Sequence, residues 1–152
     1  MNSIQNAKKI VFSPDTVATN GTNGFMVVDT KDWDYCTIDI INGTAAATTA
    51  PTTLSITESD DLTTYTAIEA FTGGAAIVAG TSSFVFPATH GNAAATETLC
   101  TFNVNCAARK RYLKANVVTG SSATIIMIAN LTRAEQAPTT AATQGSHAVV
   151  NG

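Results

Sequence analysis

The chain has 152 residues and a formal net charge of −3, and only 12% of its residues are charged, about half of the roughly 25% that is usual in globular proteins. Its 25 alanines and 26 threonines make up a third of the chain. This composition suits β-strands with short polar loops and excludes a bundle of helices with charged exposed faces. The negative net charge also argues against nucleic acid as a partner.

Apolar and polar residues alternate along most of the chain, which is typical of strands that bury one face and expose the other. Between residues 98 and 106, Cys100, Phe102 and Val104 share one face, while Thr and Asn occupy most of the other. Clusters of Gly, Asn, Ser and Thr separate the segments and predict turns, one of them at Gly73–Gly74. The predicted strands are residues 8–12, 25–29, 34–42, 53–59, 64–70, 83–86, 98–106, 111–118 and 124–132.

Eight or nine strands without a convincing helix predict an all-β fold. We expect an antiparallel β-sandwich or jelly roll of about eight strands, because two sheets can bury their apolar faces against each other. Residues 1–23 are expected to form an N-terminal arm with one weak strand, residues 24–133 the sandwich, and residues 134–152 a C-terminal arm or tail. The composition of the last segment fits either a disordered tail or an arm that orders against a neighbouring molecule.

The segment 124–132 differs from the other predicted strands because both of its faces are apolar. Ile125, Met127 and Leu131 belong to one face, and Ile126 and Ile128 make the opposite face apolar as well. Either this strand is central and covered on both sides by its own domain, or its outer face packs against another subunit. Ile126 and Ile128 are therefore candidate residues of a subunit contact.

Three carboxylates, Glu58, Asp60 and Asp61, lie within four positions between two predicted strands, which raises the question of a metal or proton-transfer site. Their spacing lacks the regular acidic positions and the glycine of a calcium loop. A general acid needs a desolvated carboxylate, and Ser and Thr surround these three. Because Asp and Ser hold tight turns by bonding to nearby backbone amides, we predict a turn here.

Other patterns typical of catalysis or cofactor binding are few. His90 falls in a predicted loop and His147 in the tail, and neither has a partner at metal-ligand spacing. The sequence contains no nucleophile elbow, no Cys-x-x-Cys pair and no phosphate-binding glycine loop. We predict a protein that is not an enzyme and that has no catalytic residues, metal or cofactor.

Cysteine usage and hydropathy bear on the compartment. Cys100 and Cys106 would lie about 20 Å apart on one extended strand, too far for a disulfide. With Cys36 they are an odd number, so we expect reduced thiols in a core and synthesis inside a cell. The N-terminus does not read as a signal peptide, and no run approaches the roughly 18 apolar residues of a membrane helix, so no membrane partner is expected.

Arg109, Lys110 and Arg111, followed by Lys114, form the strongest local cluster of charge. Three interpretations stay open: solvated strand ends that keep a sheet edge from aggregating, a dock for an acidic protein surface, or nucleic-acid binding. The last is disfavoured, because four cations without interleaved aromatic residues bind nucleic acid weakly. Arg109, Lys110 and Arg111 are therefore candidate contact residues for a protein partner.

Two segments together resemble a known family: LSITESDDLTTYTAIEAFTGG at residues 54–74 and RKRYLKANVVTGSSATIIMIANLTRAEQAP at residues 109–138. A strand, an E-S-D-D turn, a Y-T-A-I strand and a glycine pair are followed by an R-Y-L-K strand, a Gly-Ser turn, an apolar strand and a closing R-A-E-Q-A-P. This combination resembles the small jelly-roll decoration proteins of tailed bacteriophages, also called cement or head-stabilisation proteins. The two segments make up 51 of the 152 residues, about a third of the chain, and the family has no catalytic residues to carry over.

The resemblance implies a structural virion protein that is made in the host cytoplasm and located on the capsid exterior. It would contact the major capsid protein and associate with itself, often as a homotrimer. The alternative is a ligand- or carbohydrate-binding β-sandwich module of a phage fibre or surface protein. For that alternative Trp33, the single tryptophan, is the candidate platform for stacking a sugar. A shell-forming coat protein is disfavoured by the size of the chain and because no basic genome-facing arm is present.

Overall fold

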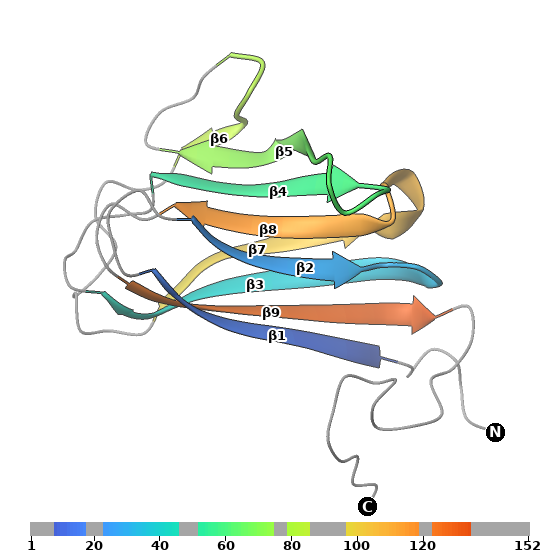
Figure 1. The fold of residues 1–152 in the computed structure, drawn as a ribbon, viewed down its shortest axis with the longest axis horizontal. Coiled ribbons are helices and arrows are strands. Elements are labelled where there is room, and N and C mark those ends of the chain that lie inside the picture. The colour runs from blue at the N-terminus through green and yellow to red at the C-terminus, as the bar shows by residue number, and fades with distance from the viewer. Residues whose placement is uncertain are drawn as a thin grey trace, which may run out of the picture.

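The computed structural model describes residues 8–17, 23–45, 52–74, 79–85, 97–118 and 123–134, which form a β-sandwich (Figure 1). The all-β prediction is confirmed, because the described residues hold nine strands and one short 3-10 helix. Of the two expected terminal arms, the described residues include β1, Asn23 and Ala134, and residues 1–7, 18–22 and 135–152 lie outside them. The elements are β1 (Lys8–Val17), β2 (Asn23–Asp29), β3 (Trp33–Ala45), β4 (Thr53–Ser59), β5 (Thr66–Gly74), β6 (Phe84–Val85), β7 (Glu97–Asn105), η2 (Cys106–Ala108), β8 (Tyr112–Val118) and β9 (Ala123–Ala134).

The sandwich has two layers. One is a four-stranded sheet in the order β1-β9-β3-β7, and the other is a five-stranded sheet in the order β2-β8-β4-β5-β6. The first half of the chain pairs with the second half in reverse order: β1 with β9, β2 with β8, β3 with β7 and β4 with β5, all antiparallel. A paired ribbon that is wound into two sheets in this way is a jelly roll. The two-residue strand β6 is an addition that runs parallel to β5.

The core lies between the two sheets. Most long strands give it alternate residues, whereas β1 contributes the partly buried Val11 and β5 contributes Ile68 and Phe71. Along β8, Leu113, Ala115 and Val117 are buried while their neighbours keep part of their exposure. A fully buried Ile or Leu contributes about 1.5–3 kcal/mol on leaving water, so the alternation itself decides which face of each strand turns inward. The buried apolar residues are Met26, Val28, Cys36, Ile38, Ile40, Leu54, Ile56, Ile68, Phe102, Val104, Cys106, Leu113, Ala115, Val117, Ile125, Met127, Ala129 and Leu131.

The first strand is longer and better anchored than the sequence predicts. β1 pairs with β9 along its whole length, from Lys8 opposite Thr132 to Val17 opposite Ala123. The strand expected within residues 1–23 is therefore part of the four-stranded sheet, and β9 ends at Ala134. The signal is weak because β1 is an edge strand: Val11 packs against the core, while lysines and a proline occupy other positions, as is common at sheet edges.

Gly73 lies within a strand and not in the turn that the sequence predicts. It pairs with Leu54 of β4 on one side and with Phe84 of β6 on the other. A Cβ atom added to Gly73 would overlap the ring of Phe84, so the absence of a side chain lets this ring lie against the strand. The Phe84 ring also lies 6.1 Å from the ring of Phe102 on β7, measured between centroids. Gly73 thus helps to close one side of the sandwich.

We expect Gly73→Ala to lower the free energy of unfolding by about 1–3 kcal/mol, because the added methyl group must displace the Phe84 ring. Chemical denaturation followed by circular dichroism measures the loss. In a Phe84→Ala background the same substitution should cost much less, since the obstructing ring is gone. Equal costs in the two backgrounds would contradict this explanation.

Candidate interaction surfaces

The acidic segment is a tight turn held by its own side chains. Ser59 is fully buried; its hydroxyl donates to the Asp61 carboxylate at 2.8 Å and accepts the Asp61 and Leu62 amides at 3.2 and 3.1 Å. The Asp61 carboxylate also accepts the amides of Thr64 and Thr63 at 2.7 and 2.9 Å. These bonds favour the charged form and hold the pKa of the Asp61 carboxyl well below its ordinary value. The predicted turn is confirmed.

The other two carboxylates reach across the end of the sandwich to the link between β7 and β8. Glu58 Oε2 accepts the Lys110 amide at 3.2 Å, and Asp60 Oδ1 accepts the Arg111 amide at 3.3 Å. The guanidinium of Arg109 lies 4.0 Å from Glu58. The acidic and basic clusters, 51 or 52 residues apart in the sequence, are therefore partners of each other. This relation was missed from the sequence, because only the folding of β4 beside β8 brings the two together.

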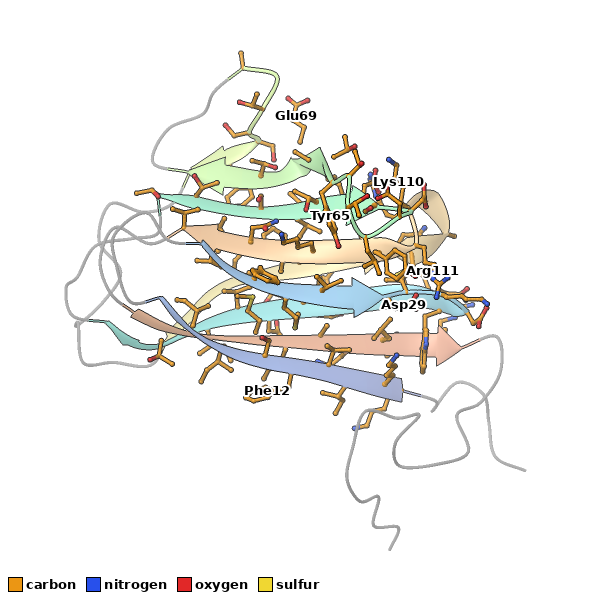
Figure 2. All side chains as sticks on the ribbon, in the orientation of Figure 1. Phe12, Asp29, Tyr65, Glu69, Lys110 and Arg111 are labelled. Carbon is orange, nitrogen blue, oxygen red and sulfur yellow. The ribbon has the colours of Figure 1, made fainter. Side chains whose placement is uncertain are left out.

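The Arg111 side chain is paired with a carboxylate of the same molecule. Its Nε and Nη2 atoms donate to the two carboxylate oxygens of Asp29 at 3.0 and 2.7 Å, and Figure 2 shows both residues at the same end of the sandwich. This bidentate contact lowers the pKa of the Asp29 carboxyl. It uses two of the five guanidinium N–H donors. A contact of Arg109, Lys110 and Arg111 with a partner stays a prediction. The two arginines also pair with carboxylates of their own chain, Glu58 and Asp29.

Ile126 and Ile128 lie on the outer face of the four-stranded sheet. β9 is a central strand between β1 and β3, and both isoleucines are half-buried, so the described part of their own domain leaves this face partly open. The register sets Phe12 opposite Ile128 and Ile41 opposite Ile126. We call the following set the outer isoleucine patch: Ile10, Phe12, Ile41, Ile126 and Ile128.

Phe12 is the most exposed member of the outer isoleucine patch, at 57%, and its ring points away from the sandwich in Figure 2. The same face turns polar toward β7, where the Thr101 hydroxyl donates to Asp39 at 2.7 Å. The sequence pointed to the two isoleucines of β9 but not to Phe12 or Ile41. Alternation places each residue on a face, whereas only the strand order shows which faces lie side by side.

The cysteines are free. Burial raises the pKa of Cys36 to about 12 and that of Cys106 to about 11, so both are protonated and weakly nucleophilic at neutral pH. The expectation of reduced thiols in a core is confirmed for these two. Cys100 is half-buried in an open hollow of about 210 Å³ between β5, β6 and β7, and its burial raises the pKa of the thiol as well.

Trp33 is partly buried against the core at the start of β3, which is the position of a residue that covers the sandwich edge. His90 and His147 lie outside the described residues. Within the described ranges, no three His, Cys, Asp or Glu side chains gather in a way that could hold a metal ion. No helix in that part of the chain is long and apolar enough to cross a membrane.

The comparisons with known proteins give little further guidance. No family model matches the chain, and no curated protein matches its sequence. One solved structure, from work titled "Bacillus endospore appendages form a novel family of disulfide-linked pili", is similar with a TM-score of 0.35 and 16% sequence identity. The similarity covers 84% of this chain and 92% of that one. The strand order of the two sheets places the chain in the class of all-β jelly-roll sandwiches.

We expect Asp61→Asn to lower stability at neutral pH by an amount that shrinks as the pH falls. A carboxyl whose folded pKa is lowered stabilises the fold above its unfolded pKa of 3.8, and this contribution is lost as the pH falls toward the folded pKa. Asn keeps an acceptor but not the charge. Urea unfolding at about pH 7, 4 and 2.5 measures the difference.

The control for this prediction is Glu69→Gln. Glu69 is an exposed carboxylate on β5 that lies apart from the turn in Figure 2. Its replacement touches none of the bonds around Asp61. A difference between wild type and Asp61→Asn that stays constant from neutral to acidic pH would contradict the electrostatic explanation.

Proposed function

We propose that this protein is a structural, non-enzymatic virion component that binds the outside of a phage capsid and stabilises it by bridging major capsid subunits. The observation that carries the proposal is the outer isoleucine patch, an apolar surface on the outside of a complete jelly roll. The resemblance of residues 54–74 and 109–138 to capsid decoration proteins supports the same function. Adhesion, rather than the turnover of a substrate, is the activity that these features favour.

The outer isoleucine patch is the surface that we assign to self-association. Phe12, Ile126 and Ile128 would leave water when a second copy covers them, and such burial contributes about 25 cal/mol per Å² of apolar area. An apolar patch with a polar border is typical of protein interfaces, and here Asp39 and Thr101 lie on the bordering strands. A closed assembly such as a homotrimer would bury the patch on every copy.

Contact with the capsid is assigned to the two terminal arms and to the corner that carries Arg109, Lys110 and Arg111. Lys8 is paired with Thr132, so the segments before residue 8 and after residue 134 leave the sandwich at one place. Figure 1 shows that β1 begins and β9 ends at the end of the sandwich where β8 begins. The arms therefore leave the domain at the end that carries the basic corner.

This arrangement explains how a small domain could stabilise a shell. A protein that binds the assembled capsid more tightly than its free subunits stabilises the capsid by mass action. If three copies associate through their outer isoleucine patches, their arm-bearing ends act together. The second and third contacts then become intramolecular, which raises the overall affinity without any new contact.

Ile126→Lys or Ile128→Lys should convert the wild-type oligomer into monomers, because a charge without a partner would have to be buried in the seam. Light scattering of the purified protein measures the change. Thr101→Lys, on the polar part of the same outer face, is the matched control and should leave the assembly intact. A wild-type monomer, or isoleucine variants that fold and assemble normally, would rule out the patch as the seam.

Purified particles should carry the chain on their exterior in a fixed ratio to the major shell protein, as measured by mass spectrometry and electron microscopy. Residues 135–152 follow directly after β9. Their removal should weaken binding to particles without changing the melting temperature. Recovery of the chain only as a free monomer would overturn the capsid proposal. Full binding by the truncated protein would exclude the C-terminal arm from the shell contact.

A further inference from the structure

The outer face of the five-stranded sheet differs in kind from the outer isoleucine patch. Alternate residues of β2 and β8 point outward there, and the register sets Asp29 opposite Tyr112 and Val27 opposite Lys114. Phe25, next outward along β2, is 48% exposed. Tyr65, from the link between β4 and β5, lies over the same face within ring-contact distance of Lys114. We call this set the aromatic face: Phe25, Tyr65, Tyr112 and Lys114.

Lys114 stands at the centre of the aromatic face. Its ammonium group lies 4.5 Å from the ring centroid of Phe25 and 5.1 Å from that of Tyr65. No carboxylate of the described residues is in an ion pair with it, whereas the neighbouring Arg111 is paired with Asp29. Aromatic rings attract a cation without cancelling its charge. The face therefore presents a positioned positive charge between two rings.

Tyr65 and Tyr112 add hydroxyl groups to the aromatic face. Burial and then the nearby Asp61 carboxylate raise the pKa of Tyr65, so its hydroxyl is protonated at neutral pH and can both donate and accept hydrogen bonds. Tyr112 lies in the strand pair that holds Lys114, with the Arg111 guanidinium 4.7 Å from its ring centroid. Because β2 and β8 are paired along their whole lengths, the backbone positions of Phe25, Tyr112 and Lys114 are fixed before a ligand arrives, which reduces the entropy lost on binding.

We propose that the aromatic face binds an anionic saccharide, a chain of pyranose rings that carries carboxylate groups. The C–H face of a pyranose ring stacks on an aromatic side chain such as Phe25, and a carboxylate pairs with the Lys114 ammonium. The tyrosine hydroxyls are suited to bond the sugar hydroxyls.

The composition of the aromatic face selects this class of ligand over two others. Nucleic acid and acidic protein surfaces are met by several cations together. Here Lys114 lies between two rings, and the Arg111 guanidinium over the Tyr112 ring is already paired with Asp29. Trp33, which the sequence suggested as a sugar platform, packs against the core, so this is a different site. The face lies on the opposite layer from the outer isoleucine patch, and the inference does not depend on the capsid proposal.

Isothermal titration calorimetry of the full chain with trigalacturonate tests the inference. We expect a dissociation constant of about a millimolar or below, as for a small and partly exposed site, and weaker binding as salt screens the charge. Neutral galactotriose should bind at least about fivefold more weakly, and so should triglutamate, which has carboxylates but no pyranose rings. Equal affinity for either comparison ligand, or no binding of about 10 mM trigalacturonate, would overturn the inference.

Two variants and two controls assign the binding to the aromatic face. Phe25→Ala and Lys114→Met should each weaken trigalacturonate binding about fivefold or more, whereas Lys114→Arg should retain most of it. Tyr35→Ala removes a ring of similar exposure, 41%, from the other sheet, where the Arg133 guanidinium lies 5.3 Å from the ring centroid, and should bind like wild type. Thermal unfolding shows that each variant is folded.

Normal binding by a folded Phe25→Ala or Lys114→Met would refute the site. Equal losses in Tyr35→Ala and Phe25→Ala would also refute it. Because these measurements use the isolated protein without particles, their failure is distinct from a failure of the capsid proposal.

Discussion

The packing of two sheets through their inner faces is the constraint on which the rest of this structure depends. Ile38 and Ile56 are fully buried and come from opposite layers, and every long strand gives one face to the same core. Because a strand has only two faces, any contact with another molecule must use the outer faces, the edges or the ends of the sandwich. The surfaces that we assign to partners all lie in those places.

The charged residues of the arm-bearing end show how a suggestive cluster can be structural. Glu58 and Asp60 accept hydrogen bonds from backbone amides of the link that enters β8, and Asp61 accepts hydrogen bonds from amides of its own turn. At Asp61 these hydrogen bonds lower the pKa of the carboxyl, which is the opposite of what a general acid requires. The cluster therefore anchors a connection between the two sheets, and the link that it holds carries Arg109 and Arg111.

The two outer faces divide the surface into unlike halves. One carries isoleucines and Phe12 beside polar threonine and asparagine pairs, and the other carries aromatic rings around Lys114. Apolar contact suits permanent association between copies, whereas rings that frame a cation suit a polar ligand with a flat apolar side. A molecule that holds copies of itself through one layer can thus keep the other layer available. This separation makes the structural role and the saccharide site compatible.

Sequence alone was enough to predict the fold class, the approximate strands and the inward residues, because side chains alternate with a period of two in any strand. It also identified the acidic turn and the two outward isoleucines of β9. The tertiary structure alone decided that Gly73 is a strand residue under Phe84, that Glu58 bonds the Lys110 amide, and that Phe12 joins Ile128. Each of these depends on which distant strands are paired and in what register, and local periodicity does not encode that.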